Sequence, residues 1–391
     1  MNAFDVRTEV AISPAGVRRL RSGHLWIYSS DVLNEPGTES PPIVRVADGA
    51  RNVLGYAFYS RQSQIRLRLL TREPEPPTRE FIRERVRVSI ERRRGFSNGN
   101  ACRLVFGEAD LLPSIIVDRY GDYLVLQTLS AGADAIKTEL IDSLRELVQP
   151  LGILERNDVR ARVLEGLPEV RGTLWGEMPE RVGIVEGGVR FLVDLSGGQK
   201  TGFFLDQSDN RIAARAYTGG RALDCFTNTG GFALHFARQC SQVLAVDISA
   251  ESLAQARQNA DLNGMTNVVF KEANVFDFLR EMEHAGEKFD TICLDPPAFA
   301  KNRAALAGAK SGYKEINLRA LRLLRPEGIL VTSSCSYHMS EALFAEILQE
   351  AARDARRYVQ RVERRGQSRD HPVLAGMPET HYLKCFVLRA I

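Results

Sequence analysis

The sequence predicts an α/β protein with a doubly wound sheet in its C-terminal half, preceded by a small β-rich barrel and a compact α+β domain. Short alternating runs come first, a mixed pattern follows from Cys102 to Gly188, and a regular alternation of strands and helices begins after Phe191. The 391 residues, 44% hydrophobic and 26% charged, suit two or three globular domains. We expect these domains at 1–74, 75–190 and 191–391.

The first domain should consist of short strands. Alternating runs separated by turn residues are typical of a small β-barrel or sandwich. These runs are Ile43–Val46, Leu54–Phe58 and Ile65–Leu70. Prolines at 74, 76 and 77 then predict a linker, and Thr78 is placed to cap a helix over 79–94.

The middle domain combines both kinds of element. Strands are expected at Ser114–Val117 and Tyr123–Gln127, and a helix is expected at Ala133–Val148. This part of the sequence contains no catalytic constellation that we recognise.

The C-terminal domain has the strand–helix alternation of a parallel sheet that is covered on both faces. The expected strands are Ala222–Phe226, Val243–Asp247, Val268–Phe270, Thr291–Asp295 and Ile329–Thr332. The expected helices are Asp209–Tyr217, Phe232–Arg238, Ala250–Asn263, Val275–Glu283, Tyr313–Leu324 and Glu341–Arg356. Because ligands of such sheets bind beyond the carboxyl ends of the strands, functional residues are expected there.

The charge distribution favours a nucleic-acid partner. The net charge is only +3, but residues 1–100 contain 17 arginines and no lysine against 11 acidic residues. Arginine suits phosphate contacts and base stacking, although a high arginine content can also follow from genomic base composition. No run approaches the ~18 apolar residues of a membrane span, and the N-terminus lacks a secretory signal. We therefore expect a cytoplasmic protein without membrane contact.

The six cysteines show neither metal-ligand spacing nor a redox pair. We expect reduced thiols and no metal site.

The first strand of the C-terminal domain leads into a glycine turn. Asp224 begins the segment DCFTNTGG, which lacks the G-x-G-x-x-G pattern of a dinucleotide site, and Asp247 ends the next strand 23 residues later. Two carboxylates complement the amino and sulfonium cations of S-adenosylmethionine, whereas they would repel the pyrophosphate of NAD. The turn therefore favours S-adenosylmethionine as the cofactor, and capping of strand ends is the structural alternative.

Two later strands end in polar segments, Asp295-Pro-Pro-Ala-Phe299 and Ser333-Ser-Cys335-Ser336. Prolines fix φ and lack a backbone donor, so Asp295 can address the edge of a base while Phe299 stacks on it. Carbon 5 of cytosine or uracil becomes reactive when a thiolate adds to carbon 6, which predicts Cys335 as a nucleophile. Asp295 would then bind N3 as charge develops. A small apolar core residue is the alternative for Cys335.

The motifs DCFTNTGGF, AVDIS, LDPPAFAK and SSCS together resemble the large-subunit (23S) ribosomal RNA cytosine-C5 methyltransferases, which join an N-terminal PUA domain to a Rossmann-like class I methyltransferase domain. Similar segments at 21–32, 64–71, 111–127 and 200–207 extend the resemblance over most of the chain. The resemblance implies an RNA-binding PUA domain, an S-adenosylmethionine site, and Cys335 and Asp295 as catalytic residues.

The expected site has two parts. The residues expected to bind S-adenosylmethionine are Gln207, Asp224, Phe226, Asn228, Gly230, Asp247, Ile248, Asn274, Val275 and Asp295. The residues expected to bind the RNA substrate are Lys200, Pro296, Pro297 and Phe299.

The sequence departs from the pattern of similar proteins at two places. Many RNA cytosine methyltransferases have a second cysteine after the prolines, which assists product release, but Ala298 and Phe299 stand there. Ser208 occupies a position where arginine is expected, which puts a contact there in doubt. Related guanine-N7 enzymes share the KTGFFLD and DPP motifs but lack the cysteine, so Cys335 discriminates between the two activities.

These expectations describe a ribosomal RNA cytosine-C5 methyltransferase that acts on a single-stranded or flipped cytosine. They are compatible with a homodimer. The alternatives are a guanine-N7 or base-amine methyltransferase and a noncatalytic RNA-binding factor of ribosome assembly.

Overall fold

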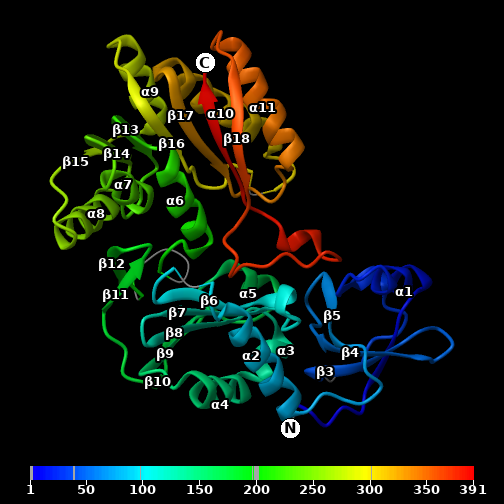
Figure 1. The fold of residues 1–391 in the computed structure, drawn as a ribbon. Coiled ribbons are helices and arrows are strands. Elements are labelled where there is room, and N and C mark those ends of the chain that lie inside the picture. The colour runs from blue at the N-terminus through cyan, green and yellow to red at the C-terminus, as the bar shows by residue number, and fades with distance from the viewer. Residues whose placement is uncertain (1–2, 38–39, 97, 196, 198–201, 301) are drawn as a thin grey trace. The chain divides into compact units, whose positions relative to one another are not determined.

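The computed structural model describes residues 3–37, 40–96, 98–195, 197, 202–300 and 302–391 (Figure 1). These residues form two compact units, and the chain passes between them several times. Unit 1 comprises Met1–Ile184, Val193–Leu205 and Arg369–Thr380, and unit 2 comprises Val185–Leu192, Asp206–Ser368 and His381–Ile391. The expected boundaries at 74/75 and 190/191 remain a prediction.

Unit 1 begins with a five-stranded sheet in the order β1-β3-β4-β5-β2. Its elements are β1 Glu9–Ala11, α1 Pro14–Arg21, β2 Trp26–Tyr28, β3 Ile43–Ala47, β4 Val53–Tyr59 and β5 Ile65–Thr71. The alternating runs predicted β3, β4 and β5, whereas β1 and β2 are only three residues long and were not predicted.

A second five-stranded sheet, in the order β10-β9-β8-β7-β6, follows in unit 1. Its elements are α2 Arg79–Arg93, β6 Ala101–Phe106, β7 Ile115–Tyr120, β8 Tyr123–Thr128, α3 Ala131–Ala135, α4 Lys137–Val148, β9 Gly152–Arg156, α5 Arg160–Leu164 and β10 Arg171–Gly176. Thr78 caps α2 by accepting from Phe81 N, as predicted. The expected helix 133–148 is divided into α3 and α4, because Ile136 departs from helical backbone geometry.

One hydrophobic core joins the two sheets of unit 1. Phe58 from β4 belongs to the same cluster of buried side chains as Leu104 from β6 and Ile82 from α2. Gly132 in α3 packs directly on the Phe58 ring, and a Cβ atom there would lie only 2.5 Å from it. The close approach explains why this position has no side chain.

Unit 2 contains a seven-stranded sheet in the order β15-β14-β13-β16-β17-β19-β18. Its strands are β13 Arg221–Cys225, β14 Gln242–Asp247, β15 Val268–Glu272, β16 Phe289–Leu294, β17 Leu324–Ser334, β18 Val359–Arg365 and β19 Lys384–Ala390. Its helices are α6 Ser208–Ala214, α7 Gly231–Ala237, α8 Ala250–Leu262, α9 Val275–His284, α10 Leu306–Leu323 and α11 Glu341–Asp354. A hairpin of β11 Arg181–Glu186 and β12 Val189–Asp194 precedes them.

The sheet of unit 2 is packed on both faces, which confirms the doubly wound fold. Leu223 and Ile292 face a core that includes buried residues of α9, α10 and α11, whereas Ala222 and Cys293 face a core with residues of α7. Strands β13 to β17 are parallel, as expected. The sheet also contains β18 and β19, which were not predicted, and β19 lies antiparallel between β17 and β18.

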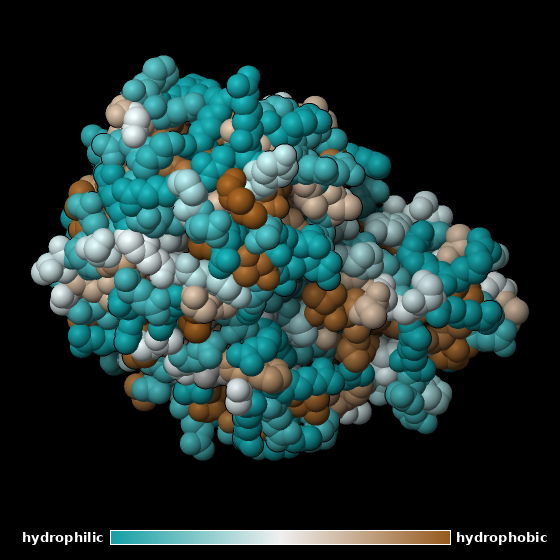
Figure 2. All heavy atoms as spheres, turned by 45° about the horizontal axis from the view of Figure 1, so that its top comes forward, coloured by the Kyte–Doolittle hydropathy of each residue, from teal (hydrophilic) through white to brown (hydrophobic). Residues whose placement is uncertain are grey.

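On the face drawn in Figure 2, hydrophilic side chains predominate and apolar residues occur in small groups. No helix among the described residues is long and apolar enough to cross a membrane.

Candidate active site

The carboxyl ends of β13, β14, β16 and β17 lie at one edge of the unit 2 sheet, because these strands are parallel neighbours. Cys225 pairs with Leu294 in register, so the residues that follow β13 and β16 emerge side by side. The backbone N–H of Asp295 points to the carbonyl of Cys225 over 3.5 Å. This edge therefore brings together most of the residues that the sequence singled out.

The turn after β13 has an unusual backbone. Phe226 and Asn228 have φ values of +63° and +50°, and Gly230 has a φ of +89°. Left-handed geometry is uncommon for residues with a Cβ atom and concentrates at functional sites. The turn is held by hydrogen bonds from Thr227 N to Val246 O at 3.0 Å and from Gly230 N to Thr227 O at 2.9 Å.

Asp224 holds this turn in place through hydrogen bonds to one carboxylate oxygen. Its Oδ2 accepts a 2.6 Å bond from the Thr227 hydroxyl and a 2.8 Å bond from the backbone N–H of Ala233 in α7. Its Oδ1 is buried and has no hydrogen-bond partner among the described residues. Burial raises the pKa of Asp224 to about 7, and the nearby charge of Asp295 adds to the rise. An unpartnered buried carboxylate oxygen fits a cationic ligand.

Asp247 at the end of β14 also contacts the turn. Its Oδ2 accepts from Asn228 N and its Oδ1 accepts from Ser249 N, both over 2.9 Å. A carboxylate has about four acceptor positions, so these two bonds leave capacity for ribose hydroxyls. The neighbouring Ile248 exposes 68% of its surface, as a wall of an open site would.

The two expected cofactor residues after β15 have different surroundings. Asn274 is exposed and caps α9 by accepting from Phe276 N at 2.9 Å. Val275 is only 4% exposed and belongs to the core between the sheet and its helices. Its side chain therefore packs in the protein interior, and only its backbone could border a ligand.

The segment after β16 is fixed at both ends. Gln207, which is 2% exposed, donates from Nε2 to Asp295 Oδ1 over 2.7 Å. Pro296 is buried and Pro297 is exposed. The Phe299 ring is half-buried, with its centroid 4.7 Å from that of Tyr313 and 5.9 Å from that of Phe276. Phe299 thus belongs to an aromatic cluster as well as to the site edge.

Cys335 follows β17 directly and is the one partly exposed cysteine of the chain. Its Sγ lies 3.8 Å from the Pro296 carbonyl oxygen, which brings together the two segments that the sequence predicted to be neighbours. The other five cysteines are buried, and burial raises the pKa of each of these thiols. Cys335 is therefore the thiol that a substrate could reach.

A buried hydroxyl network surrounds Cys335. The Tyr313 hydroxyl lies 3.0 Å from the Oγ atoms of both Ser334 and Ser336. Ser336 Oγ also accepts from the backbone N–H of Ala300 over 3.2 Å. The residues on either side of the thiol are thus tied to α10 and to the segment after β16.

The sequence did not point to two residues of this region. Tyr313 lies inside a helix that reads as ordinary core, and its hydroxyl partners become visible only in three dimensions. Lys384 is buried in β19, where it is the single basic residue at the start of the apolar run Lys384–Leu388, and that isolated charge was an available signal. Lys200, expected to contact the substrate, lies outside the described residues. Ser208 is half-buried at the start of α6.

Unit 2 also contains a buried ion cluster. Arg211 from α6 forms a two-pronged ion pair with Glu186 at 2.6 and 2.7 Å. His235 from α7 lies 3.0 Å from the same carboxylate through Nε2, and its Nδ1 accepts from Arg215 Nε over 2.8 Å. These contacts require the neutral tautomer with the proton on Nε2.

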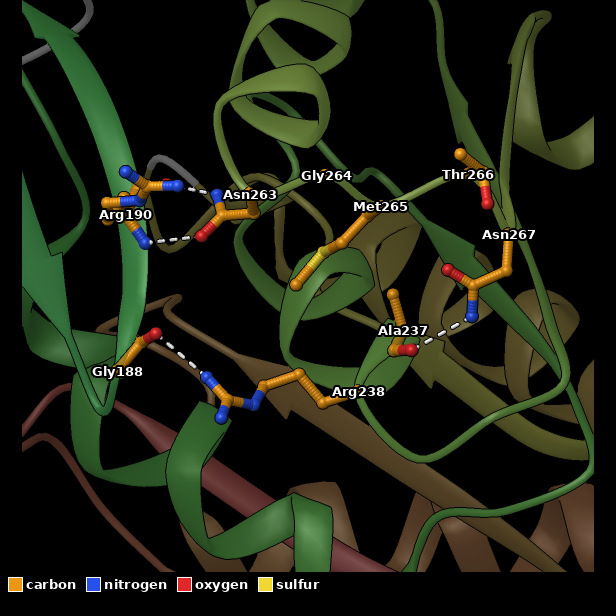
Figure 3. Close-up of a pocket in the computed structure, with 9 residues that line it drawn as sticks. All are labelled: Gly188, Arg190, Ala237, Arg238, Asn263, Gly264, Met265, Thr266 and Asn267. Atoms are coloured by element: carbon orange, nitrogen blue, oxygen red, sulfur yellow. Dashed lines mark hydrogen bonds between the residues drawn. The ribbon is translucent and has the colours of Figure 1, made fainter.

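An open polar groove of about 490 Å³ lies elsewhere on unit 2 (Figure 3). Two of its residues, Gly188 and Arg190, come from the β11–β12 hairpin, and the others lie before β14 or β15, at the amino ends of these strands and away from Asp295 and Cys335. Arg190 and Asn263 exchange hydrogen bonds there, and Arg238 donates to Gly188 O over 2.8 Å. Arg190 also donates to Leu262 O at the end of α8, and the acceptor of Arg238 lies in the turn between β11 and β12, so both arginines have a structural role.

No cluster of metal-ligating side chains occurs within the part of the chain that the structure describes.

Comparison with known families gives two matches. Residues 168–382 match the S-adenosylmethionine-dependent methyltransferase family, and residues 10–72 match a PUA-like domain. The methyltransferase match begins at residue 168, before the expected start of that domain at 191, and the PUA-like match lies within the expected domain 1–74.

Curated relatives cover nearly the whole chain. The ribosomal RNA large subunit methyltransferase I of Tolumonas auensis is 43% identical over 98% of this chain and 100% of its own length. The protein of the same name from Klebsiella pneumoniae strain 342 is 42% identical over 94% of both chains.

Solved structures share the fold. A SAM-dependent methyltransferase from Streptococcus mutans superposes with a TM-score of 0.82 at 21% identity, over 98% of this chain and 100% of its own. A methyltransferase solved in complex with SAH gives 0.83 at 22% identity over the same shares.

Proposed function

This chain belongs to the S-adenosylmethionine-dependent methyltransferases and, within them, to the ribosomal RNA large subunit methyltransferase I family; from this premise we propose that it forms 5-methylcytosine in 23S ribosomal RNA. The observation that carries the cytosine-C5 assignment is the position of Cys335. It is the accessible thiol, and it lies against the Asp295-Pro296 segment at the edge of the sheet. A base-amine or guanine-N7 methyltransferase needs no such nucleophile.

The residues around the turn fit the cofactor. Asp224 and Asp247 supply negative charge and acceptor positions, and both contact the left-handed turn that contains Phe226, Asn228 and Gly230. With Gln207, Ile248, Asn274, Val275 and Asp295 these residues form the proposed cofactor site. Bound S-adenosylmethionine would supply an electrophilic methyl group.

The chain's own residues would prepare the base. The Cys335 thiolate adds to carbon 6 of cytosine, which makes carbon 5 nucleophilic. Asp295, held in place by Gln207 through Oδ1, donates a proton to N3 as negative charge develops there. After transfer, carbon 5 loses its proton to a base and the Cys335 sulfur leaves carbon 6. Pro296, Pro297 and Phe299 would shape the base pocket, Lys200 would contact the RNA, and the PUA-like domain would hold RNA outside the pocket.

The proposal is tested by nucleoside analysis. The full chain, incubated with unmodified 23S rRNA and labelled S-adenosylmethionine, should yield labelled 5-methylcytosine. Cys335→Ala should reduce this product below detection, whereas Cys240→Ala, which removes a buried thiol elsewhere in unit 2, should retain activity. RNA containing 5-fluorocytosine at the target should trap a covalent adduct, because fluorine cannot leave as the proton does. Label found in 7-methylguanosine, or turnover by Cys335→Ala, would overturn the proposal.

A further inference from the structure

Lys384 is a buried lysine directly beside the proposed nucleophile. It is 3% exposed and begins β19, where it pairs in register with Ser334 of β17. Its Nζ donates to the carbonyl oxygens of Ser336 at 2.7 Å and Tyr382 at 2.8 Å. Both acceptors are uncharged, and one belongs to the residue that follows Cys335.

A buried ammonium normally requires a carboxylate partner, because removing a charge from water costs several kcal/mol. Within the described part of the chain, no carboxylate forms an ion pair with Lys384. Glu341, a carboxylate whose charge acts on Lys384, is paired with Arg364 at 2.9 Å. Burial lowers the pKa of Lys384 to about 8, and of the charges that oppose this shift, Cys335 contributes most. With a pKa of about 8, Lys384 is mostly protonated at neutral pH, and Cys335 is the neighbour whose negative charge would favour that state most.

The neighbouring tyrosine and carboxyl groups cannot supply a positive charge. Tyr313 from α10 is buried, and burial raises its pKa, so the phenol stays neutral. Asp295 after β16 and Glu341 at the start of α11 are carboxyl groups, which cannot supply a positive charge. Lys384 on β19 supplies the opposing positive charge.

We propose that Lys384 is a positioning residue for Cys335: its ammonium fixes the backbone that follows the thiol and stabilises the thiolate at neutral pH. This inference rests on the proposed function only in taking Cys335 as the nucleophile. A cation next to a cysteine is a common means of activating it.

The test measures the rate at which iodoacetamide alkylates Cys335 in the full native chain between pH 5.5 and 10. A Cys335→Ser chain gives the background from the five buried cysteines. In the native chain, the midpoint of the pH profile should lie below the value of about 8.5 that is typical of a free thiol. Lys384→Met should raise the midpoint by about one unit, which makes alkylation at pH 7 about tenfold slower.

Two variants separate charge from packing. Lys384→Arg keeps the positive charge and should keep a low midpoint. Lys314→Met removes a partly exposed lysine of α10 that pairs with Asp354, and it should leave the profile unchanged. Circular dichroism checks that each variant is folded.

The inference is overturned by a native midpoint at or above about 8.5, or by a folded Lys384→Met chain whose profile coincides with the native one. If Lys384→Met does not fold, the native midpoint decides. The alkylation assay does not depend on methyl transfer. If the alkylation midpoint is low and depends on Lys384 but no 5-methylcytosine forms, only the proposed function is refuted. If 5-methylcytosine forms but the alkylation profile of Lys384→Met matches the native one, only this inference is refuted.

Discussion

The side-chain amide of Gln207 donates a 2.7 Å hydrogen bond to Oδ1 of Asp295. Gln207 Oε1 accepts from Asn210 Nδ2 over 2.6 Å, which fixes the orientation of the amide. The bond connects the residue preceding α6 with the residue following β16, and it contributes to the orientation of the Asp295 carboxylate.

Gln207→Leu should slow methyl transfer to rRNA by about ten- to hundredfold. The reason is that a hydrogen bond to a charged group contributes about 1.5–3 kcal/mol, and the substitution removes that bond from Asp295. Steady-state kinetics with rRNA measures the loss in kcat/KM. Gln255→Leu is the matched control, because Gln255 is a partly buried glutamine of α8 that donates to Leu192 O. Equal kinetics for the two variants would refute an orienting role for Gln207.

Tyr313→Phe should lower both stability and activity. The change removes the hydroxyl that lies 3.0 Å from Ser334 and Ser336, and each buried partner left unsatisfied costs about 1–3 kcal/mol. Urea denaturation and the alkylation rate of Cys335 measure the two effects. Tyr56→Phe, which removes a hydroxyl bonded to Pro74 O in unit 1, should leave the alkylation rate intact. An unchanged alkylation rate in Tyr313→Phe would show that the network does not position the thiol.

Binding of S-adenosylmethionine should strengthen as the pH rises from 6 to 8. Burial raises the pKa of Asp224 in the folded protein to about 7, so the folded state favours the protonated carboxyl group. The contribution of this protonated group to the free energy of unfolding is lost as the pH rises through 7. A cationic ligand favours the ionised form, so the Kd should rise about tenfold per pH unit below 7. Calorimetry in two buffers of different ionisation enthalpy measures the affinity and the released proton. Asp224→Asn should remove the pH dependence, and the exposed Asp261→Asn should keep it.

Acidification from pH 6.5 to 4 should destabilise the protein through His235. Burial lowers the pKa of His235 in the folded protein to about 4. Between pH 6.5 and 4 the unfolded chain therefore binds a proton at this histidine that the folded chain does not bind. This contribution is present above pH 6.5 and is lost as the pH falls toward 4, by up to about 3 kcal/mol. Melting temperatures at pH 7 and 5 measure it. His235→Gln should reduce the difference between the melting temperatures at pH 7 and pH 5. The same substitution at the exposed His284 should leave that difference unchanged. If the two variants show the same change in melting temperature between pH 7 and pH 5, His235 is not the cause of the acid destabilisation.

The strand ends were predictable because parallel topology follows from local pattern. Apolar strands alternate with helices in the sequence, and this rhythm places Asp224, Asp247, Asp295 and Cys335 at one edge of a sheet. The position of a residue along its own strand is a local property, and the sequence contains it.

The partners of these residues were not predictable from local pattern. Strand β18 is rich in arginine and mostly exposed, and β19 returns to the interior of the sheet after an excursion of the chain into unit 1. The contact between Lys384 and Ser336 depends on this return. Likewise, nothing in the sequence shows that Val275 faces the core or that the Phe299 ring packs on Tyr313.

Glu186 has a practical consequence for anyone who dissects this protein. It precedes the second strand of its hairpin, yet its carboxylate neutralises Arg211 and contacts His235, which expose 3% and none of their surface. A recombinant fragment that starts at residue 191 would bury the Arg211 guanidinium without the Glu186 carboxylate, and we expect it to aggregate on expression. A fragment that starts a few residues before 185 would retain the anion, which makes the choice of cloning boundary decisive.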